Sequence, residues 1–152
     1  MGKGTSILTV HYLTTSIFDS PAVNLVNPVN CVGVMGAGLA LEFKQRFPDM
    51  FEKYKSDCDA GLLKPGCLRP YWGMTKNIIC ATTKDHWRNP SQLDWIDACL
   101  ACMAQIAPIW GNMGLPQLGC GRGGLDWRDV RPLVINRLAT LPEHFYVHVV
   151  NQ

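Results

Sequence analysis

Reactive side chains follow a short apolar segment near the middle of the chain. Residues Asn77–Ala81 predict a buried strand, and Lys84, His86 and Trp87 come soon after it. Ligands of open α/β sheets bind at the carboxyl ends of strands, so Lys84 can project into such a site. Partial desolvation lowers the proton affinity of a lysine and makes it a usable nucleophile or base. An ordinary surface lysine is the alternative interpretation.

The two other residues of this segment allow two interpretations each. His86 could act as a general acid or base, but no Ser or Cys partner stands near it, which favours a structural role at the rim of a site. Trp87 could stack on a base or cover the edge of the core. The sequence leaves the choice for Trp87 open.

Glycines gather in two clusters, each between a predicted strand and a predicted helix. The first is Gly33-Val-Met-Gly-Ala-Gly38 and the second is Gly119-Cys-Gly-Arg-Gly-Gly124. Glycine lets backbone N–H groups approach an anion closely, and the N-terminus of the following helix adds partial positive charge. Two such turns facing each other would suit a diphosphate. Tight connections that bind no ligand are the alternative.

Neither cluster fits a common nucleotide-binding motif. Gly119, Gly121 and Gly124 match G-x-G-x-x-G, but too little chain follows them for the rest of a dinucleotide-binding fold. Neither cluster continues into Gly-Lys-Ser/Thr, so no P-loop is expected either. Hydride transfer and nucleoside triphosphate hydrolysis are therefore not expected activities.

Two asparagines add polar groups beside the first cluster. Asn27 and Asn30 flank Pro28 directly after a predicted strand, Ala22–Val26. Their amides could hydrogen-bond the hydroxyls of a sugar. A turn in which each side chain bonds its own backbone is the alternative.

Composition restricts the class of protein. The chain has 152 residues, of which 47% are hydrophobic and 17% charged, and its formal net charge is +2. These values predict one globular domain over residues 1–152, and they exclude a disordered chain and a protein that grips a long nucleic acid through its phosphates. Neither a signal peptide nor an apolar stretch of about 20 residues is found, so we expect a cytoplasmic protein that does not enter a membrane.

The cysteines also favour the cytoplasm. Seven are scattered along the chain, which favours reduced thiols. Cys99 and Cys102 have the spacing of a zinc or redox pair, but a second pair of ligands is missing and both stand in a helical pattern. Packing within a helix is the favoured interpretation, and neither a metal nor a cofactor is expected.

Alternating and periodic patterns predict the strands that position these residues. The segments expected to form strands are Ile7–Leu13, Ala22–Val26, Cys67–Trp72, Asn77–Ala81, Met113–Leu118 and Phe145–Val150. Helical patterns stand between most of them. Strands that alternate with helices predict an α/β fold with a largely parallel or mixed sheet.

Local signals predict where several helices begin. Pro48 should interrupt the helix after the first glycine cluster and open another one. Ser91 and Asp94 resemble a capping box at the start of a long helix. Asp126 is expected to cap one turn, and Pro132 to take the first position of the helix that follows. The buried stripe expected on the long helix consists of Leu93, Ile96, Leu100, Met103 and Ala107.

Three motifs, in this order, resemble one known family. They are Val26–Phe43, Thr83–Arg88 and Leu118–Trp127. Together they are similar to macro domains, in particular to the DarG-like DNA ADP-ribosyl glycohydrolases, a branch related to the terminal ADP-ribose glycohydrolases. The similarity covers about residues 7–150, and the ordered combination is far more specific than any motif alone.

The resemblance implies a three-layer α/β/α macro domain whose mixed, mostly parallel sheet binds ADP-ribose across the carboxyl ends of its strands. Lys84 would be the catalytic lysine, Asn30 would orient the distal ribose, and Ser16 and Ile17 would approach the adenine. The two glycine clusters would hold the diphosphate and the distal ribose. The ligand-binding residues expected in all are Ser16, Ile17, Asn27, Gly33, Val34, Met35, Gly36, Leu118, Gly119, Cys120, Gly121, Arg122, Gly123 and Gly124.

The implied reaction cleaves the N- or O-glycosidic bond at the anomeric carbon of the distal ribose and releases ADP-ribose. Lys84 could attack that carbon to give a ring-opened Schiff base, or stabilise charge while water attacks. ADP-ribosylated DNA, in single-stranded form, is the expected substrate, and a DNA ADP-ribosyltransferase toxin the expected counterpart. The alternatives are a hydrolase of ADP-ribosylated acidic protein side chains and a non-catalytic reader of ADP-ribose.

Two positions depart from the family pattern. Many macro domains have Asp where this chain has Ser16, so adenine recognition is expected to rest on backbone or hydroxyl contacts. The terminal ADP-ribose branch has an acidic residue where this chain has Gly123, which argues against a Lys–Asp catalytic pair and resembles the DNA-directed branch.

Overall fold

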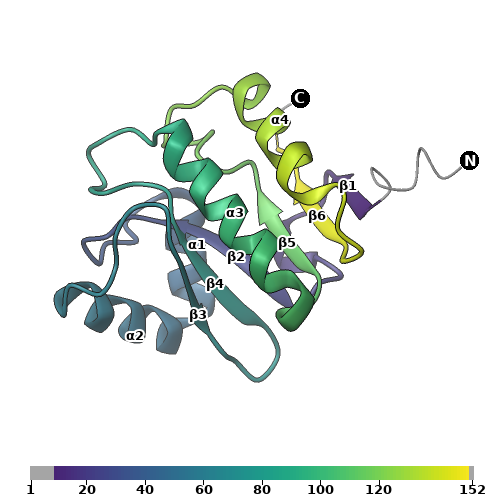
Figure 1. Ribbon diagram of the computed structural model, residues 1–152. Helices are drawn as coiled ribbons and strands as arrows, with labels where there is room; N and C mark the ends of the chain where they lie inside the picture. Colours follow the sequence, from purple (N-terminus) through teal and green to yellow (C-terminus); the bar gives the residue numbers. More distant parts are fainter. Residues whose placement is uncertain (1–8, 151–152) are drawn as a thin grey trace, which may run out of the picture.

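The computed structural model describes residues 9–150, whose arrangement is shown in Figure 1. The elements in chain order are β1 (Val10–Leu13), the 3-10 turn η2 (Ile17–Asp19), β2 (Asn24–Val29), α1 (Gly38–Arg46), α2 (Pro48–Asp59), β3 (Leu68–Tyr71), β4 (Asn77–Thr82), α3 (Leu93–Trp110), β5 (Met113–Pro116), α4 (Trp127–Leu138) and β6 (Phe145–His148). The predicted alternation and the restart at Pro48 are confirmed. Residues 7–8 of the first predicted strand lie outside the described residues.

Six strands form one sheet in the order β1-β6-β5-β2-β4-β3. Neighbouring strands are parallel, except that the edge strand β3 runs antiparallel to β4. The chain passes from β2 to β4 and then returns through α3 to β5 on the other side of β2. The strand order therefore reverses between β2 and β5. The loops after these two strands diverge, which opens a crevice at their carboxyl ends.

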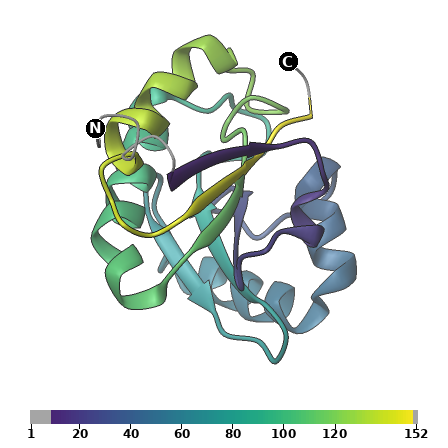
Figure 2. The same ribbon diagram turned by 90° about the vertical axis from the view of Figure 1, so that its right-hand side faces the viewer.

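Helices cover both faces of the sheet. α3 and α4 lie on one face, and α1 and α2 on the other, as the two views in Figures 1 and 2 show. Successive side chains of the central strands point to opposite faces: Val26 and Ile79 join the cluster under α3 and α4, whereas Leu25 and Ile78 join the cluster under α1 and α2. Burial on both faces explains the continuous apolar runs. The predicted three-layer α/β/α fold is confirmed.

The second strand is longer than predicted. β2 continues past Val26 to Val29, because its hydrogen-bonded pairing with β4 continues over these residues. Asn27 therefore lies inside the strand, fully buried, with its Nδ2 3.8 Å from Met35 Sδ and 3.9 Å from Cys80 Sγ. The prediction that Asn27 follows the strand is wrong.

The long helix α3 begins later than predicted. It starts at Leu93 with Gln92 as the N-cap residue and without a side-chain cap, so the predicted capping box at Ser91 is wrong. The Ser91 amide instead donates to the carbonyl of Gly123 at 3.0 Å, a contact between segments far apart in the chain. Leu93 is exposed at this end, whereas the other residues of the predicted stripe are buried: Ile96, Leu100, Met103 and Ala107.

The last helix is continuous. Asp126 accepts a hydrogen bond from the Arg128 amide at 2.9 Å and caps α4, as predicted. Pro132 does not open a second helix; it lies inside α4. A proline removes only one backbone donor, here in the middle of α4, and the burial of Val130 and Val134 on both sides of it favours a continuous helix.

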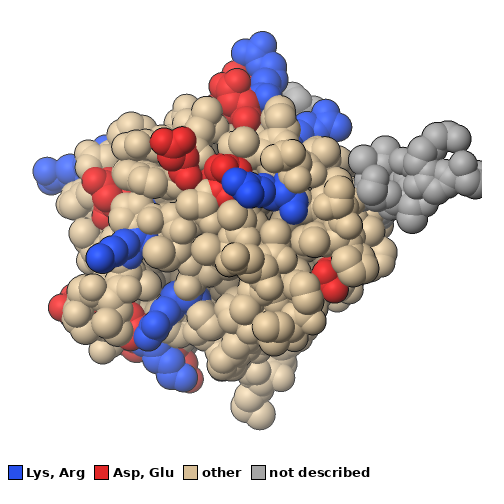
Figure 3. All heavy atoms as spheres, in the orientation of Figure 1, with Lys and Arg blue, Asp and Glu red and all other residues tan. Residues whose placement is uncertain are grey.

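Charged side chains are dispersed over the surface. On the face shown in Figure 3, basic and acidic atoms alternate among a majority of uncharged ones. No helix within residues 9–150 combines the length and the apolar character needed to span a bilayer.

Candidate active site

A cavity of about 1170 Å³ opens at the carboxyl ends of the central strands. Its lining comes from the ends of β2, β4, β5 and β6 and from the first turns of α1 and α4. This is the edge where the strand order reverses, the usual ligand position in such sheets. The volume is ample for a nucleotide-sized ligand.

The second glycine cluster forms one wall as a tightly folded loop. Gly119 has a φ of 75°, and its carbonyl accepts the Leu125 amide at 2.9 Å, so the loop closes on itself. Gly123 lies so close to Ser91 that an added Cβ would stand 2.5 Å from the Ser91 Oγ. These contacts require glycine at positions that the sequence identified only as a cluster.

The first glycine cluster is held by Asn30 at the end of β2. The Asn30 Nδ2 donates to the Val34 carbonyl at 2.8 Å, while its Oδ1 accepts the Val32 amide at 3.0 Å. The hydroxyl of Tyr54, on α2, approaches both the Asn30 carbonyl at 2.8 Å and the Asn30 Oδ1 at 2.9 Å. Local sequence does not indicate this role, because Tyr54 stands among the apolar residues that α2 buries.

We expect Tyr54→Phe to destabilise the protein by about 1–3 kcal/mol, since the buried Asn30 loses a hydrogen-bond donor. Tyr54 is fully buried, and burial raises the pKa of its phenol, which therefore stays a donor at neutral pH. Urea unfolding measures the change in the free energy of unfolding. Tyr146→Phe is the matched control, because within residues 9–150 the Tyr146 hydroxyl has no hydrogen bond. Equal stabilities for the two variants would contradict this role of Tyr54.

Lys84 emerges beside the first loop. The amides of Thr83 and Lys84 both approach the Val29 carbonyl, at 3.0 and 3.3 Å, which continues the pairing of β4 with β2. The Lys84 Nζ donates to the Trp87 carbonyl at 3.4 Å, and within residues 9–150 it has no carboxylate partner. Burial lowers the pKa of Lys84, and the nearby positive charge of Arg122 lowers it further. A solvated surface lysine would not show these features.

The turn after Lys84 is rigidly held. The Asp85 Oδ1 accepts the His86 amide at 2.7 Å and the Asn89 side-chain amide at 3.1 Å, while the His86 Nδ1 accepts the Arg88 amide at 3.1 Å. The Cys31 thiol donates to the Lys84 carbonyl at 3.3 Å. His86 thus has the structural role that the sequence favoured, and the turn is fastened to the first loop.

The structure brings most of the predicted site residues to this cavity. Those that line it are Asn30, Val34, Gly36, Lys84, Gly119, Cys120, Gly121, Arg122 and Gly123. Those outside its lining are Ser16, Ile17, Asn27, Gly33, Met35, Leu118 and Gly124. Ser16 accepts the Phe18 amide and caps η2, and Ile17 is buried. Their segment is next to the cavity wall, because the neighbouring Thr15 carbonyl lies 3.0 Å from the Nδ1 of His148, a lining residue.

Backbone amides and a helix end favour an anion in the cavity. Among residues 9–150, the N–H groups of Gly121, Arg122 and Gly123 have no protein acceptor. α1 begins at Gly38, beside the cavity, with no side-chain cap and no acidic residue in its first turn. Such a helix N-terminus attracts negative charge. A diphosphate between the two glycine loops would satisfy these donors.

No group of three or more metal-binding side chains is assembled in the described part of the chain. Cys99 is fully buried in the core, and its thiol donates to the Cys67 carbonyl at 3.6 Å. Burial raises the pKa of both Cys99 and Cys102. Both cysteines lie within α3, as predicted, and Cys99 packs in the core on the α3 side of the sheet.

A family model described as Macro domain matches residues 26–134. A DNA ADP-ribosyl glycohydrolase of Mycobacterium tuberculosis is 42% identical over 125 residues, which cover 78% of this chain and 36% of that protein. The chain thus spans little more than a third of the length of this curated relative.

Solved structures give the same result. The macrodomain of Mycobacterium tuberculosis DarG matches with a TM-score of 0.87 at 36% identity, over 94% of this chain and 98% of that one. Thermosipho africanus DarTG in complex with ADP-ribose matches with a TM-score of 0.89 at 27% identity, over 95% of this chain and 42% of that one. With the sheet order, the two glycine loops and these matches in agreement, the chain belongs to the macro domain family.

Proposed function

We propose that this macro domain binds ADP-ribose and cleaves the bond between its distal ribose and a DNA base, with Lys84 as the catalytic residue. The observation that carries the proposal is the position of Lys84 beside two glycine loops that can hold a diphosphate. Lys84 is partly buried and has no carboxylate partner in the described part of the chain. The similarity to a DNA ADP-ribosyl glycohydrolase supports DNA as the substrate.

The strand order supports one orientation of the ligand. The second glycine loop follows β5, the first follows β2, and Lys84 follows β4. A diphosphate between the two loops would have the reacting ribose on the β4 side and the adenosine on the β6 side. Three strand spacings separate β4 from β6, about 14 Å, a span that suits the two ends of a dinucleotide-like molecule. Ser16 and Ile17 are proposed to contact the adenine, and Asn30 to orient the ribose.

We propose that the neutral amine of Lys84 attacks the anomeric carbon of the distal ribose. The carbon–nitrogen bond to the base breaks, and the base takes a proton from solvent as it leaves. The bond between the anomeric carbon and the ring oxygen of the ribose then breaks. The amine nitrogen passes one proton to the freed oxygen and the other to solvent, which leaves a Schiff base, and water hydrolyses the Schiff base to ADP-ribose and free lysine. The amides of Gly121 and Gly123 would hold the diphosphate during these steps.

The rate of hydrolysis is expected to rise with pH through the pKa of Lys84, because only the neutral amine attacks. That pKa lies below the ordinary value, through burial and through the charge of Arg122. In Arg122→Ala the repelling cation is lost, the pKa of Lys84 rises, and the midpoint of the pH–rate profile moves to higher pH. Single-turnover rates between pH 6 and pH 10, roughly the range over which such a lysine titrates, measure the midpoint.

Arg122→Lys is the control for this profile. It keeps a positive charge at the same place, so its midpoint should stay near that of the wild type. A rate that falls as pH rises would show instead that the ammonium form is required, and would favour charge stabilisation with water as the nucleophile.

The proposed function is tested by incubating the protein with single-stranded oligonucleotides that carry ADP-ribose on thymidine or on guanosine. Release is followed by the gel mobility of the oligonucleotide and by the free ADP-ribose formed. We expect release from one of the two. Binding of ADP-ribose without release from DNA or from modified peptides would make the protein a reader.

The substrate of this reaction must come from an enzyme that attaches ADP-ribose to DNA. We propose a DNA ADP-ribosyltransferase as the functional counterpart of this domain. Co-expression with such a transferase should lower the amount of ADP-ribosylated DNA in the cell, and unchanged DNA modification would contradict this pairing.

A further inference from the structure

We propose that Trp87 and Arg88 form a docking surface for the DNA part of the substrate: the indole of Trp87 stacks on the modified nucleobase, and Arg88 contacts a neighbouring phosphate. This inference rests on the proposed function and deepens it, because it explains how the site would distinguish a nucleobase from an acidic protein side chain.

Trp87 lies beside Lys84, the residue proposed to react with the substrate. It lines the same cavity as Lys84, and its carbonyl accepts the hydrogen bond from the Lys84 Nζ at 3.4 Å. The indole is 47% exposed and belongs to neither of the two buried clusters. Trp87 therefore does not cover a core edge, and the alternative left open by the sequence, stacking on a base, fits its position.

The indole is presented on a fixed support. The hydrogen bonds of the Asp85 carboxylate and the His86 ring hold the backbone of the turn. The His86 ring centroid lies 5.3 Å from the Trp87 ring, and the Arg88 guanidinium lies 4.7 Å from it. An aromatic platform that is ordered before binding loses little side-chain freedom when a base stacks on it.

The charges around this turn suit a short piece of nucleic acid. Arg88 and Arg122 have no ion-pair partner among residues 9–150, whereas Arg128, at the same cavity, is paired with Asp126. Two unpaired guanidinium groups can contact one or two phosphates. The net charge of +2 fits a few phosphate contacts, whereas binding along a long strand would require many cations. Aromatic stacking and a few cations are the usual elements of single-strand binding.

A carboxylate leaving group would gain no stacking on the Trp87 indole. The side chain of a modified glutamate or aspartate has no ring to stack on the indole, whereas every nucleobase has a π-face. Loss of the indole should therefore slow the reaction of ADP-ribosylated DNA more than that of a protein that carries the same ADP-ribose.

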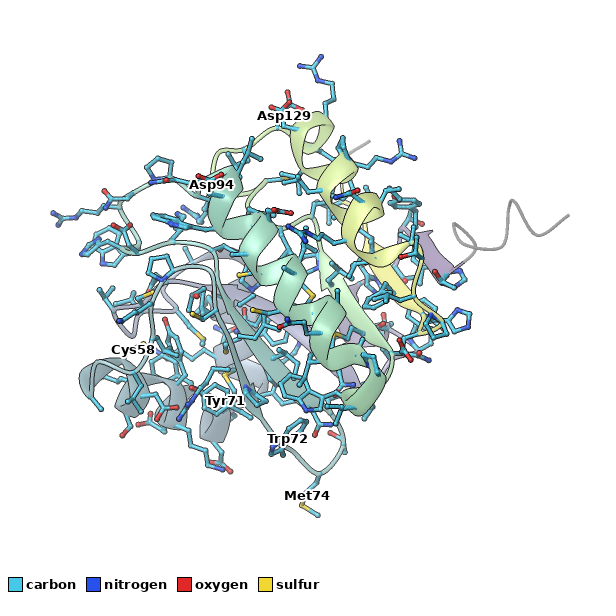
Figure 4. The ribbon with its side chains drawn as sticks, viewed as in Figure 1. Cys58, Tyr71, Trp72, Met74, Asp94 and Asp129 are labelled. Atoms are coloured by element: carbon cyan, nitrogen blue, oxygen red, sulfur yellow. The ribbon has the colours of Figure 1, made fainter. Side chains whose placement is uncertain are left out.

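A second exposed tryptophan provides the control. Trp72 is 55% exposed and touches Trp110 edge-on at 5.1 Å. It follows β3, near Met74 at the tip of the hairpin, far from the end of α3 that carries Asp94 (Figure 4). Trp72 is absent from the lining of the cavity that holds Lys84.

The test compares kcat/KM for an ADP-ribosylated oligonucleotide with kcat/KM for a peptide ADP-ribosylated on glutamate. In Trp87→Ala we expect a loss of about 10- to 100-fold on the oligonucleotide, and a loss at least about five times smaller on the peptide. Trp87→Phe should restore most of the lost rate on the oligonucleotide. Trp72→Ala should match the wild type on both substrates. Equal losses on the two substrates in Trp87→Ala would overturn the inference.

Arg88 is tested by salt dependence. Loss of one phosphate contact with a single strand should reduce the slope of log(kcat/KM) against log[salt] by about 0.7 in Arg88→Ala. Arg131→Ala is the matched control, because the Arg131 guanidinium lies 5.0 Å from the Tyr12 ring in a similar pair away from the cavity. An unchanged slope in Arg88→Ala would overturn the phosphate contact.

A binding experiment separates this inference from the proposed function. In the Lys84→Ala background, the affinity for an ADP-ribosylated oligonucleotide should exceed that for free ADP-ribose. The added Trp87→Ala change should remove the stacking part of this excess, and Trp87→Ala together with Arg88→Ala should remove nearly all of it. If the wild type releases ADP-ribose from neither substrate, the proposed function fails. The comparison of affinities still shows whether Trp87 and Arg88 bind the DNA part of the substrate. No excess affinity for the oligonucleotide would overturn the inference.

Discussion

Replacing Lys84 with Ala is expected to lower the release of ADP-ribose from DNA on the order of 10³-fold while ADP-ribose still binds. The lysine supplies the proposed nucleophile, whereas the glycine loops and the N-terminus of α1 hold the diphosphate. Single-turnover hydrolysis measures the first property and isothermal titration calorimetry the second. Because Lys84 has no ion pair within residues 9–150, its removal leaves no carboxylate unpaired there, and the variant should fold normally.

Two controls accompany this variant. Lys84→Arg keeps the charge but not a nucleophilic amine, so it should be as inactive as Lys84→Ala if attack by the amine is the mechanism. Lys64→Ala changes an exposed lysine outside the cavity and should leave hydrolysis unaltered. Undiminished hydrolysis by Lys84→Ala would remove Lys84 from the chemistry altogether, and strong activity in Lys84→Arg would favour charge stabilisation.

The second large effect is expected from Gly123→Ala, which should destabilise the protein and weaken ADP-ribose binding together. The new Cβ would overlap the Gly119 carbonyl oxygen and stand 2.5 Å from the Ser91 Oγ, so the loop must shift away from α3. Overpacking of this kind costs about 1–3 kcal/mol. For a chain of this length, that lowers the melting temperature by about 2–12 °C. Thermal unfolding and calorimetry measure the two consequences.

Gly121→Ala is the matched control in the same loop. Nothing lies within 4 Å of its added Cβ, and its φ is not positive, so the melting temperature should stay within about 2 °C of the wild type. If Gly123→Ala is as stable as Gly121→Ala, the close contact with Ser91 does not constrain the loop.

The regular elements could be predicted closely from local patterns. Short apolar runs predicted the strands β4 and β6 to within two residues, because burial on both faces of the sheet leaves a continuous apolar run. The predicted strand ends were wrong where the end of a strand depends on its pairing with a neighbouring strand. β2 extends through Asn27 because its ladder with β4 continues, and a polar residue is accepted in the strand when neighbouring strands supply the hydrogen bonds.

Long-range contacts also account for the errors at helix ends. Ser91 has the side chain of an N-cap residue, but its backbone amide donates to the carbonyl of Gly123. This hydrogen bond holds the chain in place before α3 begins. Nothing within a few residues of Ser91 predicts this contact. Pro132 was assigned to a helix start by its local preference, whereas the continuous burial of Val130 and Val134 decides in favour of a single helix.

The candidate site was predictable where its residues follow strands directly. Lys84 and both glycine loops stand at strand ends, and parallel strands bring their carboxyl ends to one edge. Tyr54 was not predictable as a site residue, because it lies on α2 and reaches Asn30 only after the helix packs on the sheet. The exclusion of Asn27 from the cavity likewise depends on the register of β2.

The sequence by itself determined the α/β class, the family resemblance and the reactive residues, because these depend on composition, periodicity and short motifs. Only the tertiary structure decided which of those residues share a cavity and what each one contacts. The strand order sets the spacing between Lys84 and the loops, and the turn that follows Lys84 leaves Trp87 exposed at the cavity instead of buried in the core. These properties arise from pairing and packing between distant segments, which local sequence patterns do not encode.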